Sequence, residues 1–184
     1  VVSGSCSPMS GAQIEWAGRH GFYTARLDIA SCLEAARRIN EIERLVSDAV
    51  AQIAGGVSPV VFSAQGPDDP AVTGFDAVAH AAGFTREDAA RKVGDTLAEI
   101  MRQILDRSNV RRVVVAGGDS SGAVASHLGI QALTVASAIA PGAPLCRAWS
   151  HQSKRDGLEI ALKGGQLGSV SFYGTVRDGV SDSS

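Results

Sequence analysis

The sequence has few aromatic residues and no cluster of basic ones. Phenylalanine, tryptophan and tyrosine make up only 5% of the 184 residues, so we expect a core of alanine, valine, leucine and isoleucine. The formal net charge is −2 at pH 7, and no run of lysine or arginine stands out. This balance gives no electrostatic reason to expect binding to nucleic acid or to an anionic membrane surface.

Cysteine is also scarce. The three cysteines, Cys6, Cys32 and Cys146, lie far apart and lack Cys-x-x-Cys spacing. An odd, scattered set argues against a disulfide scaffold and against a zinc site, and it favours a reducing compartment. We therefore expect a cytoplasmic protein without a protein-held metal.

Long apolar runs are missing as well. The longest uncharged stretch, between Asp119 and Arg147, is interrupted by Pro141 and Pro144, so it fits broken strands and turns better than a membrane span. No signal peptide is visible. The chain begins without methionine and directly in a strand-like run. We therefore expect residues 1–184 to be a single domain taken from a longer protein.

Three common nucleotide-binding signatures do not occur. The sequence holds no G-x-x-x-x-G-K-[ST] motif and no complete G-x-G-x-x-G after a strand-like run. It also lacks the His-Arg-Asp and Asp-Phe-Gly motifs of protein kinases. These absences argue against a P-loop protein, a Rossmann dinucleotide site and a protein kinase.

Strand-like and helix-like segments alternate along the chain. Strands are expected at 1–2, 23–29, 59–64, 111–116, 132–138, 145–149 and 158–163. Helices are expected at 8–19, from 31 to about 54, from 85 past 104, and at 121–128. Residues 65–84 predict a loop with at most one helical turn, and the tail after Arg177 is polar and expected to fray. The alternation predicts a three-layer α/β/α domain with a largely parallel central sheet.

Local signals support the predicted helices. Ser7 is a candidate N-cap with Pro8 at the first helical position. Ser31-Cys32-Leu33-Glu34 and Thr85-Arg86-Glu87-Asp88 both match the capping box. One apolar face of the helix after Ser31 should be buried; its members are Leu33, Ile39, Ile42, Val46, Ala49, Val50 and Ile53.

Three short turns rich in glycine and small hydroxyl residues each follow a predicted strand. They are Gly4-Ser5-Cys6-Ser7, Gly117-Gly118-Asp119-Ser120-Ser121-Gly122 and Gly164-Gly165-Gln166-Leu167-Gly168. Such turns let backbone N–H groups surround an anion, and a following helix adds its dipole. Parallel sheets bind ligands beyond the carboxyl ends of their strands. We therefore expect the three turns to converge on the phosphates of a nucleotide.

The second of these turns carries the sharpest signal. Gly117 and Gly118 would let the chain pass close to phosphates, and Ser120 would donate a hydroxyl. Asp119 has three possible roles: capping the helix, orienting a ribose hydroxyl or holding Mg²⁺ through water. The plainer interpretation is a strand-to-helix turn in which Asp119 or Ser120 is the N-cap.

Gly118-Asp119-Ser120-Ser121-Gly122 also satisfies G-x-S-x-G, the nucleophile elbow of serine hydrolases. No aspartate or glutamate lies between Ser121 and His151, and no histidine follows Asp156. The serine–acid–histidine order of α/β-hydrolases is therefore impossible, although other orders exist. A serine hydrolase using Ser120 remains the alternative from the enzyme classes.

Two further residues have both a functional and a plain interpretation. Cys6 could be a nucleophile at a helix N-terminus, where thiolates are favoured, but a buried structural cysteine is commoner. Lys163 could reach a phosphate, but a solvated strand end is the commoner fate of a lone lysine. None of the four histidines lies in a recognisable catalytic pattern.

Together the motifs resemble one family, the four-carbon acid sugar kinases, which phosphorylate 3-oxo-tetronate, threonate or erythronate with ATP. The resemblance covers essentially the whole chain and matches the family's C-terminal, nucleotide-binding domain. The segments that carry it are the three turns, Gln13-Ile14, and Ile139-Ala140-Pro141-Gly142-Ala143-Pro144-Leu145-Cys146.

The resemblance implies a domain that binds ATP with Mg²⁺. The acid sugar would bind an N-terminal domain with an Asp-Asp-x-Thr-Gly motif, which this sequence lacks. That domain would also supply most catalytic groups, so we expect the isolated chain to be inactive. A homo-oligomer and a non-catalytic nucleotide-binding module both stay open. The residues matched to the ATP site are Ser5, Ser7, Gly117, Gly118, Asp119, Ser120, Gly164 and Gly165.

Two departures from the family pattern stand in these segments. Relatives usually have threonine at the position of Ser120, a change that keeps the hydroxyl. They also have Lys-Ser-Gly-Asn-Phe-Gly where this chain has Lys163-Gly164-Gly165-Gln166-Leu167-Gly168. The loss of an aromatic residue and a serine implies an altered contact with the base or ribose there.

Overall fold

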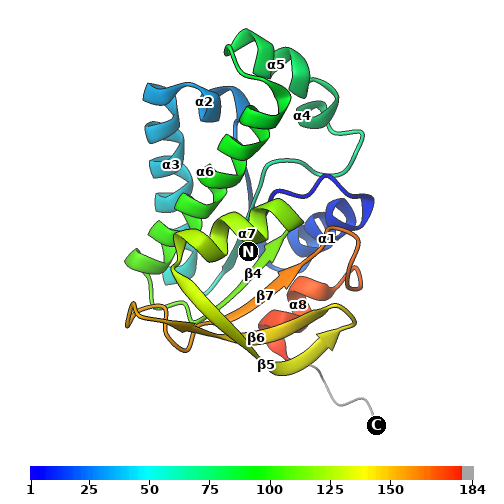
Figure 1. Cartoon of the computed structure of the whole chain (residues 1–184). Coiled ribbons are helices and arrows are strands. Elements are labelled where there is room, and N and C mark those ends of the chain that lie inside the picture. Colours follow the sequence, from blue (N-terminus) through cyan, green and yellow to red (C-terminus); the bar gives the residue numbers. More distant parts are fainter. Residues whose placement is uncertain (180–184) are drawn as a thin grey trace.

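A seven-stranded sheet forms the centre of the molecule in the computed structural model, which describes residues 1–179 (Figure 1). Its strand order is β2-β3-β1-β4-β7-β6-β5. The strands are β1 (Val2–Ser3), β2 (Phe22–Arg26), β3 (Ser58–Phe62), β4 (Arg112–Ala116), β5 (Ile130–Ala140), β6 (Ala143–Ser150) and β7 (Glu159–Lys163). Strands β2, β3, β1, β4 and β7 run parallel, whereas β5 and β6 form an antiparallel hairpin at one edge.

Helices cover both faces of the sheet, so the predicted three-layer α/β/α fold with a largely parallel sheet is confirmed. Helices α1 and α8 pack on one face, and α2, α3, α6 and α7 on the other. The helices are α1 (Pro8–Arg19), α2 (Ile29–Leu33), α3 (Ala35–Ala54), α4 (Pro70–Thr73), α5 (Phe75–Ala81), α6 (Arg86–Arg107), α7 (Gly118–His127) and α8 (Phe172–Asp178).

The central strands are buried on both faces, which explains their continuous apolar sequence. In β4, Val113 and Val115 point into the core beneath α3 and α6, while Val114 and Ala116 point toward α1 and α8. Because the two faces of β4 line two different cores, its side chains are apolar on both faces.

A cavity of about 500 Å³ lies at the amino ends of these strands, between Val1, Pro59 and Val113.

Two of the three helix starts that were predicted from capping signals are confirmed. Ser7 caps α1, because its Oγ accepts a hydrogen bond from Ser10 N at 3.1 Å. Thr85 caps α6 in the same way, with Asp88 N as the donor at 3.1 Å. The capping box at Ser31 is wrong.

Asp28 replaces that capping box one turn earlier. Its carboxylate accepts from Ala30 N at 3.1 Å and from the Ser31 hydroxyl at 2.6 Å. With its hydroxyl engaged by Asp28, Ser31 lies inside α2, and α3 begins separately at Ala35 without a side-chain cap.

Other element boundaries also differ from the prediction. The expected loop at 65–84 contains α4 and α5. Helix α8 was not predicted, and it ends at Asp178, one residue into the tail that was expected to fray. Helix α7 starts at Gly118, three residues before the predicted Ser121. The rest of the tail, residues 180–184, lies outside the described residues.

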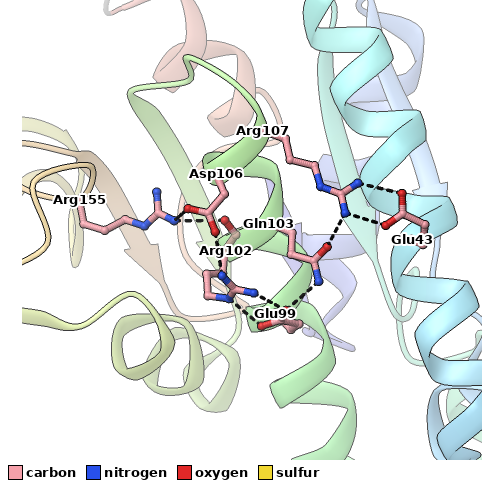
Figure 2. A network of polar contacts seen from close by, with 7 residues as sticks. All are labelled: Glu43, Glu99, Arg102, Gln103, Asp106, Arg107 and Arg155. Atoms are coloured by element: carbon pink, nitrogen blue, oxygen red, sulfur yellow. Dashed lines mark hydrogen bonds and ion pairs between the residues drawn. The ribbon is translucent and has the colours of Figure 1, made fainter.

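A network of charged side chains joins α3, α6 and the loop before β7 (Figure 2). Arg107 bridges from α6 to Glu43 on α3 with two bonds of 2.7 and 2.8 Å. The buried Arg155 pairs with Asp106, whose other oxygen accepts from Arg102 at 2.7 Å. The network lies toward the amino ends of β4 and β7, away from the glycine-rich turns, and ties helices together.

Strand β5 is the exposed edge of the sheet. Its residues 131–138 are exposed, and Val135 is 66% exposed.

Over the described range, no helix has both the length and the apolar character needed to cross a bilayer.

Two isoleucines of α3 provide a matched test of this packing. The helical pattern predicted both Ile39 and Ile42 to be buried, but Ile39 is 70% exposed and only Ile42, at 7%, enters the core. We expect Ile42→Ala to lower the free energy of unfolding by about 2–4 kcal/mol. Ile39→Ala should change it by less than about 0.5 kcal/mol. Urea denaturation measures both, and equal losses would contradict the packing of α3.

Candidate functional site

The three glycine-rich turns follow neighbouring strands. The first turn (residues 4–7) follows β1, the second turn (residues 117–122) follows β4, and the third turn (residues 164–168) follows β7. Gly4 N donates to Ala116 O at 3.0 Å, and Gly117 N donates to Lys163 O at 2.9 Å. The first turn thus extends the pairing of β1 with β4, and the second turn extends the pairing of β4 with β7. The structure therefore brings all three turns to the carboxyl edge of the sheet.

This edge holds the topological switch point of the fold. Strand β1 leads into α1 on one face of the sheet, whereas its neighbour β4 leads into α7 on the opposite face. The two connections diverge beyond the strand ends, which is where open α/β sheets bind their ligands. The first and second turns begin these two connections.

The first and second turns pack directly on each other. A Cβ on Gly4 would overlap the Ser120 hydroxyl, and a Cβ on Gly117 would lie 3.3 Å from Ser5 N. Gly117 also has φ +114°, which side-chain-bearing residues rarely adopt. Gly117 is therefore required by backbone conformation and packing, apart from any approach of a phosphate.

Helix α7 begins without a side-chain cap. Its N-cap is Gly117, which has no side chain to accept a hydrogen bond. The plainer interpretation, with Asp119 or Ser120 as the N-cap, is therefore wrong. The first N–H groups of a helix have no partner within it, and the dipole there favours an anion. A Cβ on Gly118 would meet nothing within 4 Å. The space beside Gly118 is thus free of other protein atoms.

Asp119 is the acidic residue of this first helical turn, and it is exposed. Among residues 1–179 no three histidine, cysteine, aspartate or glutamate side chains gather as a metal site would require. Asp119 therefore belongs to no preformed metal cluster among these residues.

The third turn is fastened to α1 through the backbone carbonyl of Gly165. That oxygen accepts from Ser7 Oγ at 2.7 Å, Ser10 Oγ at 3.0 Å and Lys163 Nζ at 3.3 Å. Gln13 continues the contact, because its Nε2 donates to Leu167 O at 3.0 Å and to Ser169 O at 2.8 Å.

Glycine is needed at position 165 because a Cβ there would overlap the Ser5 hydroxyl. Ser5 Oγ in turn accepts from Ser7 N at 3.2 Å. The predicted site residues Ser5, Ser7 and Gly165 are thus brought together. Gly164 lies beside them and packs against Leu167.

Lys163 differs from its expected solvated strand end. The residue is 1% exposed, and its Nζ donates to Gly165 O and, at 3.4 Å, to Ser10 Oγ. Burial without a carboxylate partner lowers the pKa of this ammonium to about 8. Lys163 therefore places a buried cation beneath the third turn.

Sequence reasoning overlooked Ser10 as a structural partner of the third turn. Ser7, Ser10 and Gln13 are spaced three residues apart and share one side of α1, so this polar stripe was the available signal. The stripe had no assigned role because its partners are backbone carbonyls more than 150 residues away.

The surroundings of Ser120 do not suit a hydrolase nucleophile. Ser120 is the third residue of α7, is 5% exposed, and packs toward Gly4. A nucleophile elbow instead presents its serine on a sharp, strained turn, and no non-glycine residue between 1 and 179 has a positive φ. His127 lies seven residues farther along the helix, about 10 Å away at 1.5 Å per residue.

Cys6 is exposed and also lacks the features of a reactive thiolate. Partial burial and the carboxylate of Asp69 raise its thiol pKa, and Arg86 only partly opposes them.

Comparison with known proteins places this geometry in a family. A family model described as "Nucleotide-binding C-terminal domain" matches residues 1–173. A curated protein of Paraburkholderia graminis, named 3-oxo-isoapionate kinase, is 61% identical over 179 residues, 97% of this chain and 38% of that protein. A 3-oxo-tetronate kinase of Pectobacterium atrosepticum is 30% identical over 183 residues, 94% of this chain and 38% of that protein.

Solved structures share the fold. The crystal structure of a Haemophilus influenzae protein superposes with a TM-score of 0.78 at 26% identity, covering 97% of this chain and 39% of that chain. The chain thus spans about two fifths of the length of the relatives it matches.

The buried Lys163 predicts a pH dependence of stability. Unfolding returns its pKa from about 8 to its ordinary 10.5, so between these values the unfolded chain holds the extra proton. The free energy of unfolding should therefore rise with pH over this range.

Between pH 7.5 and pH 10.5, we expect the free energy of unfolding of the parent chain to rise by about 2–3 kcal/mol relative to that of Lys163→Met. Denaturant unfolding at each pH measures the difference. Lys154→Met, at an exposed lysine, is the control and should show no such trend. A pH-independent difference for Lys163→Met would contradict burial of the ammonium.

Proposed function

The chain belongs to the nucleotide-binding C-terminal domain family, and from that premise we propose that it binds ATP at the carboxyl edge of its sheet. One observation carries the proposal: the three glycine-rich turns follow adjacent strands and meet at the switch point between β1 and β4. The uncapped start of α7 supports this position for the phosphates, because it offers N–H donors and a favourable dipole to an anion.

The predicted site residues take two roles in this proposal. The backbone N–H groups of Gly118, Asp119 and Ser120 bind phosphate oxygens, since they begin α7 and have no partner within the helix. Ser5, Ser7, Gly117, Gly164 and Gly165 hold the three turns together by packing and hydrogen bonds.

Magnesium would enter this site with the nucleotide. Mg²⁺ usually keeps several waters and binds phosphate oxygens with one or two carboxylates. The exposed carboxylate of Asp119, next to the proposed phosphate donors, fits that role. Bound Mg²⁺ would neutralise phosphate charge during transfer.

We propose that the longer protein is a kinase of a 3-oxo sugar acid. The two curated relatives are named kinases of 3-oxo-isoapionate and 3-oxo-tetronate, and the first is the more similar at 61% identity. Phosphoryl transfer depends mainly on positioning and charge neutralisation, so it needs donor and acceptor in line. This chain holds the donor, and the remaining part of the protein holds the acceptor and its base.

The start of α7 provides the direct test of ATP binding. We expect Gly118→Val to weaken ATP binding at least tenfold, about 1.4 kcal/mol, because the branched side chain would occupy the space open to phosphates. Isothermal titration calorimetry with ATP and Mg²⁺ measures the affinity, and titrations with NADH and with buffer alone are the negative controls.

Gly122→Val is the matched control, because Gly122 lies one turn farther along α7 and its Cβ also meets nothing within 4 Å. It should bind ATP like the parent chain, and melting curves exclude unfolding of either variant. No ATP binding at millimolar concentration by the folded parent would overturn the proposal.

The division of labour predicts that chain 1–184 alone does not phosphorylate 3-oxo-isoapionate or 3-oxo-tetronate. The longer protein should consume ATP with one of these acids, as a coupled ADP assay would measure. Turnover by the isolated chain would show that the acceptor site lies within it.

ATP binding without turnover by the longer protein would instead favour a non-catalytic nucleotide-binding module. A homo-oligomer and a cytoplasmic location stay predictions.

A further inference from the structure

Strand β5 ends the sheet on one side and has a strand neighbour only at β6 (Figure 1). With 11 residues it is the longest strand of the sheet. Residues 131–138 are all exposed. Because successive side chains of a strand point to opposite faces, neither face of this stretch is covered. The outer backbone groups of β5 therefore face no other strand among the described residues.

The sequence of β5 does not protect this edge. Proteins usually protect an exposed edge strand with lysine, with proline or with a covering segment. Strand β5 contains no charged residue and no proline. Its register with β6 is regular from Ala132, opposite Trp149, to Val135, opposite Cys146, and shifts on either side of this stretch. Residues 132–135 thus form a regular, uncharged edge that can accept another strand.

Two apolar side chains lie exposed on this stretch. Leu133 is 40% exposed and Val135 is 66% exposed. They share one face of β5, and Leu133 lies opposite Ala148 of β6, which is buried in the core. Leu133 and Val135 therefore extend the apolar surface of the core to the exposed edge of the sheet.

The exposed stretch is complementary to itself. When a strand pairs antiparallel with its own copy, a two-fold axis places one residue opposite the same residue of the copy. With the axis at Thr134, Leu133 lies opposite Val135 of the second copy, and Ala132 lies opposite Ala136. Apolar pairs and threonine pairs across strands are favourable. Because β5 is uncharged, this pairing brings no like charges together.

We propose that β5 is the surface through which two copies of this chain associate, as an antiparallel β5–β5 pair centred on Thr134. The pair would join the two sheets into one. A second copy fits this edge better than the remaining part of the longer protein, because that part must reach the start of α7 at the strand ends. This last comparison rests on the proposed function, whereas the exposure and the self-complementarity of β5 do not.

A charge at the centre of the edge tests the association. We expect the parent chain to be a dimer in sedimentation velocity at high micromolar concentration. Val135→Lys should weaken the dimer at least about tenfold, because it places an ammonium opposite Leu133 of the other copy without a counter-charge. Ile39→Lys is the matched control, because Ile39 is 70% exposed and lies on α3. It should dimerise like the parent chain.

A cysteine at the two-fold axis tests the register without adding a charge. Thr134→Cys places two thiols opposite each other, so mild oxidation should give a disulfide-linked dimer on a non-reducing gel. The parent chain contains the exposed Cys6, so its oxidation in parallel gives the background. Ile39→Cys should not exceed that background.

Each outcome supports or overturns the proposal. A monomeric parent chain overturns it, and so does a folded Val135→Lys that dimerises as tightly as the parent. Growth of the parent chain into assemblies larger than a dimer overturns the closed two-fold pairing. If Val135→Lys does not fold, the cross-link decides: linkage of Thr134→Cys above background supports the β5–β5 pair, and its absence overturns it.

Discussion

The carboxyl edge depends on one backbone oxygen, the carbonyl of Gly165. It accepts hydrogen bonds from Ser7, Ser10 and Lys163, and it thereby joins the end of β7 to the start of α1. The third turn has no regular secondary structure of its own, so these donors hold its path. The packing of Gly165 on Ser5 and of Gly164 on Leu167 both follow from that path.

The fold was predictable because its main signals are local. Strand β4 has the sequence Arg-Val-Val-Val-Ala, an apolar run that is expected of a strand buried on both faces. Thr85 caps α6 through the backbone N–H of Asp88, only three residues away in the sequence.

The short helices were not predictable in the same way. Helix α8 contains Gly174, a poor helix former that is present because the Trp16 ring lies where a Cβ would be. That contact joins residues 158 positions apart, so no local pattern indicates it.

Part of the candidate site was predictable for a related reason. The three turns could be assigned to one edge because parallel strands end together. The role of each individual glycine could not be predicted from the sequence. Gly4 and Gly165 allow one turn to pack on another, Gly117 adopts a positive φ, and Gly118 alone faces open space. All four look alike in the sequence, and only tertiary contacts separate them. The burial of Lys163 was missed for the same reason, because its partners are Ser10 on α1 and a backbone carbonyl.

The charge of the proposed site bears on the proposed division of labour between this chain and the rest of a longer protein. The eight residues assigned to ATP binding supply backbone N–H groups, hydroxyls and one carboxylate, and they include no lysine or arginine. The nearby Lys163 is buried beneath the third turn with neutral partners. Neutral donors orient a triphosphate but do not cancel its charge, and metal ions usually neutralise the charge that develops during transfer. We infer that the missing positive charge comes from Mg²⁺ at Asp119 and from the part of the protein that binds the sugar acid. Transfer would then begin only when both parts enclose the phosphates.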